Sequence, residues 1–337
     1  MTPAKPASAP KTAIVLAGGG SLGAVQVGML RALLESGVEP DMVVGSSVGS
    51  INGAYFAGDP TLDGIAKFER LWCGLKRRDI FPRTWRRHFG FSRGRGHLVT
   101  SDGLRHLLDS HLPYRDLKNA AVPVHIVASD VLSGKAVVLS RGPLTQAILA
   151  STAIPAAFAP VEIDGRLLCD GAIASNTPVT AAISLGARRL IVVPTGFACA
   201  PERPPSGAIA RALHAITLLT ASQLVAELER IRQPTQYHIL PAACPLGVSP
   251  FDFARTQDLI DQAYRRTLSW ISEGGLDSNV IPDALRPHSH TEPAASRPDL
   301  IRSSGGRSGG QHPCHPSTET PLLLRSSLSC EPRHHVC

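Results

Sequence analysis

The chain has 337 residues, of which 43% are hydrophobic and 18% are charged, and its formal net charge at pH 7 is +7. This composition supports a sizeable buried core and excludes a wholly disordered protein, and the length suits one large domain or two modest ones. Seven cysteines without a C-x-x-C pair indicate neither a disulfide framework nor a zinc site, and they favour a reducing cytoplasm.

The two ends of the chain differ in composition from the middle. Residues 1–11 contain Pro3, Pro6 and Pro10 and no long apolar run, so we expect a flexible leader rather than a signal peptide. Residues 283–337 contain no Phe, Trp or Tyr, and Ser, Pro and Gly make up 20 of these 55 residues. Such a segment buries too little apolar surface to offset its ordering entropy, which predicts a disordered tail. The folded domain is therefore predicted at 12–282.

Within this domain, short apolar runs alternate with segments in which apolar residues recur at helical spacing. The predicted strands are Thr12–Ala17, Met42–Val44, Val122–Ala128, Lys135–Leu139, Leu167–Cys169, Arg189–Val193 and Tyr237–Leu240. The predicted helices are Gly23–Glu35, Ser50–Ala57, Ser101–Ser110, Pro143–Ser151, Pro178–Leu185, Ala208–Ile231 and Phe251–Ser272. This alternation indicates an α/β fold with three α/β/α layers and a mostly parallel central sheet. No segment has the ~20 apolar residues that a membrane-spanning helix needs.

The first glycine-rich turn, Gly18–Gly23, lies between a predicted strand and a predicted helix and matches G-x-G-x-x-G. A dinucleotide site of this kind needs an acidic residue near the end of the second strand, whereas Asp41 precedes that strand. NAD or FAD binding is therefore a distant alternative, and no cofactor is predicted. Consecutive glycines still expose backbone N–H groups beside a positive helix end, and these can stabilise an oxyanion as readily as a phosphate.

A second turn, Gly45-Ser46-Ser47-Val48-Gly49, matches G-x-S-x-G between a strand and a helix. This arrangement lifts a serine hydroxyl out of the chain at a strained elbow, and the N–H of Val48 would point at a developing oxyanion. Both turns follow early strands, so in a parallel sheet they open at the same carboxyl edge. The glycine donors and Ser47 are therefore expected in one crevice.

A serine nucleophile needs a base. His214 lies in a predicted helix and His238 on a predicted strand, and neither follows an obvious strand-end loop. Asp170 does, because it comes directly after the apolar run Leu167–Cys169. Partial burial would raise its pKa and make it an effective base.

These motifs resemble those of the patatin-like phospholipase family. The sequences G-G-G-S-L-G, G-S-S-V-G and D-G-A occur in this order, and Ala150-Ser151, Pro155 and Asn176-Thr177-Pro178 add to the likeness, which covers about Ala13–Leu185. The resemblance implies a patatin-like fold and a lipid acyl hydrolase with a Ser–Asp dyad and without histidine or metal.

Carried over by position, the resemblance makes Ser47 the nucleophile and Asp170 the general base. Gly18, Gly19, Gly20 and Val48 would form the oxyanion hole, and the remaining motif positions are Gly23, Gly45, Gly49, Gly171 and Ala172. Many members carry Arg or Lys where this chain has Leu22. The loss of that charge weakens any expectation of anionic phospholipid head groups.

A basic and aromatic segment lies at about residues 72–97. Between Lys76 and Arg95 there are eight Lys and Arg residues and one acid, and Phe81, Trp85 and Phe89 recur every four residues. Packing as a cap on the core, contact with an anionic membrane surface, and nucleic-acid binding are all compatible with this pattern. No nucleic-acid motif accompanies the segment, so we predict a cap or lid and no nucleic-acid partner.

The predicted function is hydrolysis of lipid carboxylic esters, of the phospholipase A or lysophospholipase kind, in the cytoplasm or at the periphery of a membrane. Acyl transfer or thioester hydrolysis on the same dyad is an alternative, and so is a non-catalytic lipid-binding regulator. The oligomeric state stays open.

Overall fold

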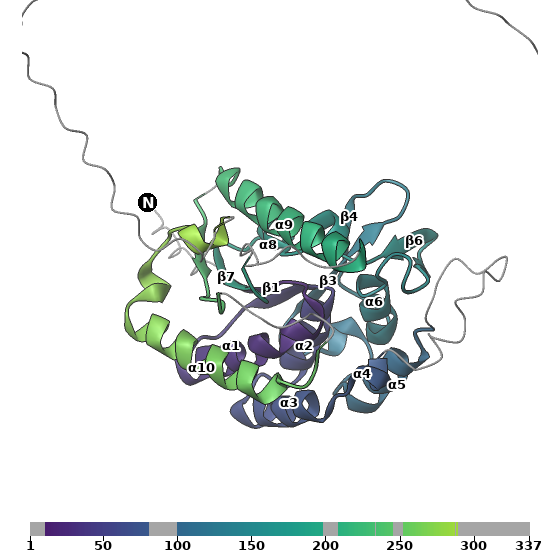
Figure 1. Ribbon diagram of the computed structural model, residues 1–337, viewed down its shortest axis with the longest axis horizontal. Helices are drawn as coiled ribbons and strands as arrows, with labels where there is room; N and C mark the ends of the chain where they lie inside the picture. Colours follow the sequence, from purple (N-terminus) through teal and green to yellow (C-terminus); the bar gives the residue numbers. More distant parts are fainter. Residues whose placement is uncertain are drawn as a thin grey trace, which may run out of the picture. The chain divides into compact units, whose positions relative to one another are not determined.

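A sheet of eight strands forms the centre of the described structure. The computed structural model describes residues 11–80, 100–197, 208–232, 234–244, 252–286 and 288, all within one compact unit. The strands are β1 (Thr12–Leu16), β2 (Met42–Ser46), β3 (Val124–Asp130), β4 (Ala136–Leu139), β5 (Val161–Ile163), β6 (Arg166–Cys169), β7 (Arg189–Val193) and β8 (Gln236–Ile239). They are arranged in the order β5-β6-β3-β2-β1-β7-β8, and β4 pairs with β3 outside this path (Figure 1).

Five neighbouring strands, from β3 to β8, run parallel to one another. The strands β4 and β6 are antiparallel to β3, and β5 is antiparallel to β6. In the middle of the sheet, Ile14 of β1 pairs with Val43 on one side and Ile191 on the other. The predicted α/β fold with a mostly parallel sheet is confirmed.

Ten α-helices lie among the described residues. They are α1 (Ala24–Glu35), α2 (Val48–Gly58), α3 (Leu62–Gly74), α4 (Arg77–Ile80), α5 (Asp102–His111), α6 (Leu144–Ser151), α7 (Ala172–Ser175), α8 (Val179–Ser184), α9 (Ala208–Glu229) and α10 (Thr256–Ser272). Short 3-10 helices are found at Gly20–Gly23, Leu117–Asn119, Gly275–Asp277 and Asp283–Leu285.

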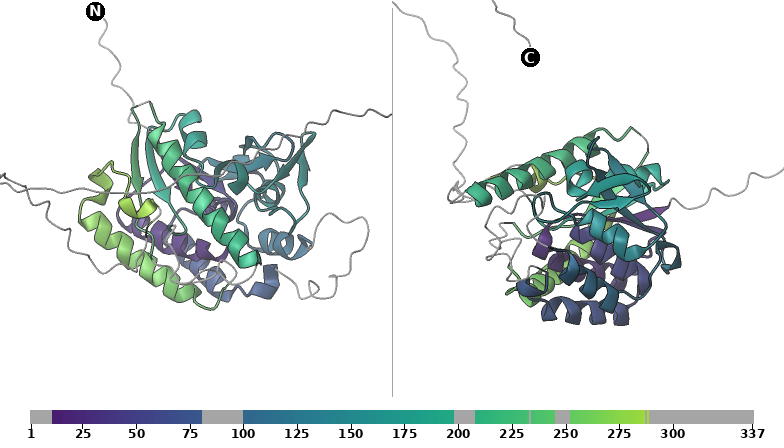
Figure 2. Two further views of the ribbon diagram at one scale, coloured as in Figure 1. Left: turned by 45° about the horizontal axis from the view of Figure 1, so that its top comes forward. Right: turned by 90° about the vertical axis from the view of Figure 1, so that its right-hand side faces the viewer.

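Alternate side chains of the strands build a separate core on each face of the sheet. On β1, Ile14 and Leu16 pack with α1, α2, α3, α5, α6 and α10. Ala13 and Val15 face the opposite way and pack with α8 and α9. Figures 1 and 2 show these two helical layers with the sheet between them, and the predicted three-layer arrangement is confirmed.

The sequence pattern located most helices and strands to within a few residues but missed four of them. The helices α3, α4 and α7 and the short strand β5 were not predicted, and the directions of β4 and β6 were not specified. The aromatic repeat Phe81, Trp85 and Phe89 lies outside the described residues. Trp72, taken as the start of the cap segment, belongs instead to α3 and is only 4% exposed.

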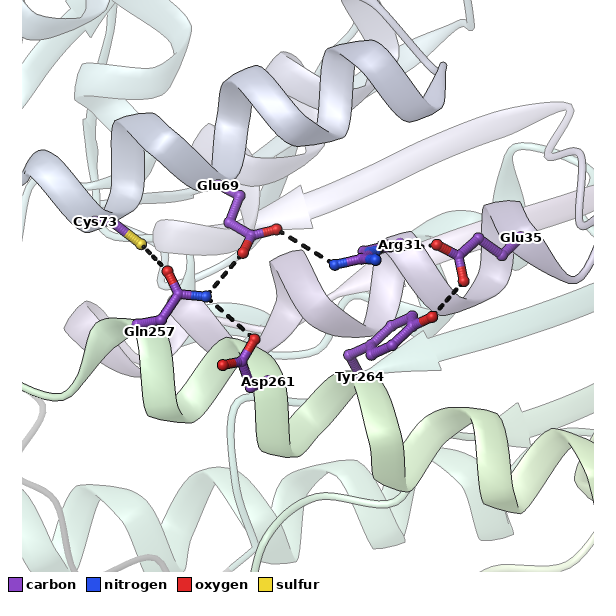
Figure 3. A network of polar contacts seen from close by, with 7 residues as sticks. All are labelled: Arg31, Glu35, Glu69, Cys73, Gln257, Asp261 and Tyr264. Carbon is purple, nitrogen blue, oxygen red and sulfur yellow. Dashed lines mark hydrogen bonds and ion pairs between the residues drawn. The ribbon is translucent and has the colours of Figure 1, made fainter.

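Helix α10 lies against α1 at very close range. A Cβ atom on Gly28 of α1 would collide with the backbone carbonyl of Ile260 on α10. Along this seam, Arg31 pairs with Glu35 and stacks on the ring of Tyr264, whose hydroxyl donates to Glu35 (Figure 3). Gln257 extends the network from α10 to α3 by donating to Glu69.

The predicted tail begins too early. Asp283–Leu285 form a 3-10 helix, Leu285 is 2% exposed in the core beside α8 and α9, and Arg286 bonds to Glu229 at 2.7 Å. Residue 287 and residues 289–337 lie outside the described part of the chain, as do residues 1–10 of the predicted leader.

The cysteines of the described residues differ in their bonding. Cys73 and Cys169 carry free thiols, whereas Cys244 is disulfide-bonded, a bridge that the cysteine spacing does not predict. Over the stretches of chain described above, no helix combines the length and the apolar character needed to cross a bilayer.

Candidate active site

Ser47 occupies a strained turn between β2 and α2. Its backbone angles are φ 51° and ψ −125°, in a region that non-glycine residues rarely adopt. The turn also leaves little room for side chains, because a Cβ on Gly45 would collide with the carbonyl of Gly49, and one on Gly49 with the carbonyl of Leu16. The glycines of G-x-S-x-G are therefore required by the close backbone packing of this elbow.

The hydroxyl of Ser47 donates a hydrogen bond of 2.8 Å to Oδ2 of Asp170. The other carboxylate oxygen of Asp170 accepts from the N–H of Ala172 at 2.8 Å. Asp170 is 4% exposed and Ser47 is 9% exposed. The structure thus brings together the two residues that the sequence singled out, which lie 123 positions apart.

Antiparallel pairing, rather than a shared parallel edge, brings Asp170 to Ser47. Cys169 at the end of β6 pairs with Ser129 of β3, and β6 runs back toward the start of β3. Val127, two residues earlier on β3, pairs with Ser46 of β2. Asp170 therefore emerges level with the end of β2, where Ser47 begins the elbow.

Burial governs the acid–base chemistry of Asp170. Loss of solvent raises the pKa of the carboxyl group from 3.8 to about 6, and the hydrogen bonds from Ala172 and Ser47 oppose this rise. No cation pairs with Asp170 in the described salt bridges. A carboxylate with this pKa accepts a proton more readily than an ordinary aspartate and is still ionised at neutral pH.

The glycine turn lies beside Ser47, but its three glycines differ in their hydrogen bonding. The N–H of Gly18 donates to the carbonyl of Asn176 at 3.0 Å, so the prediction that Gly18 is an oxyanion donor is wrong. Its role is close packing, because a Cβ there would lie 3.0 Å from the Cβ of Ser47. For Gly19, Gly20 and Val48, no partner of the backbone N–H is found in the described structure.

Gly19 and Gly23 are also required on steric grounds. A Cβ on Gly19 would run into the side chain of Thr195, whose hydroxyl donates to the carbonyl of Gly18 at 2.6 Å. A Cβ on Gly23 would press on the side chain of Val48. The turn thus packs directly against the elbow helix, and both glycine motifs depend on the same contact.

A buried polar chain that the sequence analysis missed supports the turn from below. Gln26 of α1 donates to the carbonyls of Ala17 and Val193, both at 2.9 Å. Asn52 of α2 donates to Gln26 at 2.7 Å and accepts from the indole N–H of Trp72 at 3.1 Å. The available signal was an amide side chain next to apolar residues in each helix, with Gln26 between Val25 and Val27 and Asn52 after Ile51.

Ser151 and Ser129 hold the backbones of Ser47 and Asp170 in place. The hydroxyl of Ser151 accepts from the N–H of Ser47 at 2.9 Å and donates to the carbonyl of Val127 at 2.6 Å. The hydroxyl of Ser129 donates to the carbonyl of Asp170 at 2.8 Å. Gly171 fits because a Cβ there would collide with the carbonyl of Val127.

Helix α9 holds the segment that follows Asp170. Gln223 donates to the carbonyl of Ala174 at 2.6 Å, and Glu227 accepts from the hydroxyl of Thr180 at 2.8 Å. This segment contains Asn176, whose carbonyl fixes Gly18. A single run of chain therefore carries the Asp170 carboxylate and anchors the glycine turn.

An apolar pocket begins at the elbow. Ser47, Val48 and Gly20 line it together with hydrophobic side chains of α2, α3 and α5. Its few polar side chains include Ser21, Thr152 and His111. Such a pocket suits an aliphatic chain attached to a reacting group at Ser47.

The two histidines considered as bases lie elsewhere. His238 on β8 contacts the carbonyl of Ser278 at 2.9 Å, and burial lowers its pKa. His214 lies on α9, and neither histidine is a hydrogen-bond partner of Ser47 or Asp170. In the described portion of the chain, no group of three or more His, Cys, Asp or Glu side chains is placed to hold a metal ion.

Comparison with known sequences identifies the class of protein. The model of the patatin-like phospholipase family matches residues 14–183, half of the chain, and the chain belongs to this family. The match contains Ser47, Asp170 and both glycine motifs, and it ends before α9 and α10. The patatin fold predicted from the motifs is thereby confirmed.

The chain is similar to several curated proteins. It is 32% identical over 186 residues to an NTE family protein of Mycobacterium tuberculosis described as uncharacterized, covering 55% of this chain and 49% of that protein. It is 29% identical over 189 residues to patatin-like phospholipase domain-containing protein 7 of Rattus norvegicus, covering 55% of this chain and 13% of that protein. The chain thus spans about half the length of the mycobacterial relative.

Two solved structures are also similar. VipD from Legionella pneumophila matches with a TM-score of 0.41 and 15% identity, covering 80% of this chain and 67% of that chain. Human GIVD cytosolic phospholipase A2, in complex with methyl γ-linolenyl fluorophosphonate, matches with a TM-score of 0.42 and 15% identity, covering 80% of this chain and 59% of that chain.

Proposed function

We propose that this protein hydrolyses carboxylic esters of lipids through a Ser47–Asp170 dyad. The observation that carries the proposal is the 2.8 Å hydrogen bond from Ser47 to a buried carboxylate, at a strained elbow that opens into an apolar pocket. Membership of the patatin-like phospholipase family supports a lipid ester as the substrate.

In the first half of the reaction, Asp170 Oδ2 takes the proton from Ser47 Oγ while that oxygen attacks the ester carbonyl carbon. The tetrahedral intermediate collapses, the alcohol leaves with the proton from Asp170, and the acyl group remains on Ser47. In the second half, Asp170 takes a proton from water, which attacks the acyl carbon. The fatty acid leaves, and Ser47 Oγ regains the proton.

The negative charge that develops on the carbonyl oxygen needs donors already in place. The backbone N–H groups of Gly19, Gly20 and Val48 are the proposed donors, because they have no other partner in the described structure and line or adjoin the elbow. Val48 begins α2, so the positive end of that helix adds to the stabilisation. Gly18 is left out because its N–H already bonds to Asn176.

Acyl transfer and thioester hydrolysis use the same acyl-enzyme and differ in the acceptor or the leaving group. A non-catalytic lipid-binding role would need neither the strained elbow nor the buried carboxylate, both of which cost stability. The hydrolase is therefore the favoured function.

Two aspects of the proposal concern location. Contact with an anionic membrane is proposed from the basic segment, most of which lies outside the described residues, although Lys76 and Arg78 are exposed at its start. A cytoplasmic location is proposed from the cysteine count, and the disulfide at Cys244 is the observation that opposes it, because disulfides are rare in the cytosol.

The test is covalent labelling of the full chain with a fluorophosphonate probe, combined with turnover of a p-nitrophenyl ester. We expect Ser47→Ala to abolish both signals, and Asp170→Asn to reduce both by at least about 10³-fold, because the serine then lacks its base. Ser184→Ala is the matched control, because Ser184 is exposed on α8 and outside the site.

Each outcome separates the candidate functions. Labelling of Ser47 without hydrolysis, but with transfer of the acyl group to an added alcohol, would favour acyl transfer. If the probe does not label the folded wild-type protein, either alone or with anionic vesicles, the result would favour the non-catalytic lipid-binding role. Full activity of Asp170→Asn would exclude the dyad.

A further inference from the structure

We propose that the stacked side chains of Tyr55 and Phe68 close the far end of the pocket and limit the acyl chain to medium length. This inference rests on the proposed function, in which the acyl carbonyl sits at Ser47. It adds a specificity for chain length that neither the motifs nor the family match supplies.

The pocket follows the axis of α2 away from the elbow. Ser47 caps the start of this helix, and the pocket-lining residues Val48, Ile51 and Tyr55 lie on one face of it at positions 1, 4 and 8 after the serine. With a rise of about 1.5 Å per residue, Tyr55 lies about 12 Å along the helix axis from Ser47. The position of a residue along α2 therefore gives its distance from Ser47 within the pocket.

Helix α3 runs in the opposite direction and forms the second wall. Phe68 stacks on Tyr55 with ring centroids 4.3 Å apart, and Trp72, one turn later, bonds to Asn52, nearly one turn closer to Ser47. Leu75, which directly follows α3, also lines the pocket. The aromatic pair therefore marks the end of the slot between α2 and α3.

The end of α5 supports the same region from behind. Leu112 lines the pocket and is 6% exposed, and the hydroxyl of Tyr114 donates to the carbonyl of Ala54, the neighbour of Tyr55. Phe68 is 1% exposed and belongs to the large core cluster. A chain that reached the aromatic pair would have to displace core side chains to go further.

The length of the slot sets the expected chain length. A zigzag alkyl chain with C–C bonds of about 1.5 Å advances about 1.3 Å per carbon, so a 12 Å slot holds about eight to ten carbons. Each methylene that enters the slot should raise kcat/KM by about fourfold, from its transfer out of water. Methylenes beyond the end contribute nothing or force the chain out of position.

The experiment uses linear alkyl fluorophosphonates with four, eight, twelve and sixteen carbons, and measures the rate of covalent labelling of Ser47 in the full chain by mass spectrometry. For the wild-type protein we expect the labelling rate to rise up to eight carbons and to fall at least tenfold by sixteen. Tyr55→Ala should raise the ratio of the sixteen-carbon to the eight-carbon rate at least tenfold. Ile51→Phe should shift the optimum to the shortest probe.

Two control variants distinguish loss of the stacked Tyr55–Phe68 pair from a nonspecific effect of substitution. Tyr55→Phe keeps the stacked ring and should keep the wild-type ratio, and so should Leu62→Ala, an exposed side chain of α3 that does not line the pocket. If Tyr55→Ala does not fold, the wild-type profile and Ile51→Phe decide the question.

Failure of the chain-length limit is distinct from failure of the hydrolase. A wild-type rate that stays level or rises to sixteen carbons, or a folded Tyr55→Ala variant with an unchanged ratio, would overturn the limit and leave Ser47 as the nucleophile. If no probe labels Ser47, both proposals fall together.

Discussion

Asp170 is held in an environment that favours its protonated form, although the proposed chemistry needs the carboxylate. Its burial raises the pKa to about 6, and only two hydrogen bonds compensate for the lost water. At neutral pH the group is therefore an ionised and poorly solvated base. Burial therefore has two consequences: it makes Asp170 a better proton acceptor, and it lowers the stability of the folded state.

The raised pKa predicts how activity depends on pH. Below about pH 6, kcat/KM for a p-nitrophenyl ester should fall about tenfold per pH unit, because Asp170 is then protonated in the free enzyme. Above pH 7 the profile should be flat. Measurement between pH 4.5 and 8.5 checks this, and a midpoint near 4 would contradict the effect of burial.

The same shift predicts how stability depends on pH. The folded-state pKa of about 6 lies above the unfolded value of 3.8, so the folded state binds the proton more tightly. The stability from this group is complete below about pH 4 and is lost as the pH rises through 6. The free energy of unfolding of Asp170→Asn, minus that of the wild type, should therefore be about 2–3 kcal/mol more favourable at pH 8 than at pH 4. Urea unfolding of both proteins at pH 4 and pH 8 measures this difference. The same difference at the two pH values would exclude a raised pKa of Asp170.

At the level of elements, the seam between α1 and α10 depends more on close packing than on its polar network. The residues drawn in Figure 3 are partly solvent-exposed, and exposed ion pairs such as Arg31–Glu35 contribute less than about 1 kcal/mol each. Gly28, in contrast, lets the backbones of the two helices approach so closely that no Cβ fits.

Gly28→Ala should therefore lower the free energy of unfolding by about 1–3 kcal/mol, through a forced separation of α10 from α1. Gly74→Ala is the control, because Gly74 is also a helical glycine, the last residue of α3, but has open space around it. This control should be neutral or gain about 0.5–1 kcal/mol from helix propensity. Equal losses in the two variants would show that the seam tolerates separation.

Elements with a local pattern could be predicted from the sequence, and so could the pairing of Ser47 with Asp170. Asp170 was found because it directly follows an apolar run, although β6 proved antiparallel to β3. Strand direction depends on which segments pair, and that is not encoded in the six residues around Asp170. Helix α3 was not predicted because Trp72, which shares a buried face with Ile65 and Phe68, was assigned to the basic and aromatic segment that follows.

Contacts between distant segments could not be predicted. Gly18 looked like an equal member of the glycine turn, yet its N–H bonds to Asn176, 158 positions away. Trp72 looked like part of a surface segment, yet it bonds to Asn52 in the core. In both cases the neighbouring sequence does not reveal what the residue does. Its role depends on a hydrogen-bond partner that is distant in the sequence and is brought close by the fold.

For the molecule as a whole, the two helical layers are unequal, and the thinner one needs the C-terminal segment. Helices α8 and α9 cover their face of the sheet together with Leu285, which is 2% exposed, while Arg286 pairs with Glu229 of α9. The hydrogen bonds that hold Ser47 and Asp170 come from β3 and α6, and none of them involves Leu285 or Arg286. Removal of the C-terminal segment should therefore lower the free energy of unfolding and leave the reactivity of Ser47 unchanged.

Ending the chain after Pro282 should lower the free energy of unfolding by about 1.5–3 kcal/mol, the cost of exposing the site that Leu285 fills. Ending it after His288 should change stability by less than about 0.5 kcal/mol, because the rest of the tail has the composition of a disordered segment. Leu285→Ala in the full chain should reproduce much of the first loss. Urea unfolding of the three proteins, with Ser47 labelling rates measured well below the unfolding midpoint, separates the effects. Labelling rates should match the wild type in all three, and a slower rate in the folded shorter chain would mean that the segment reaches the site.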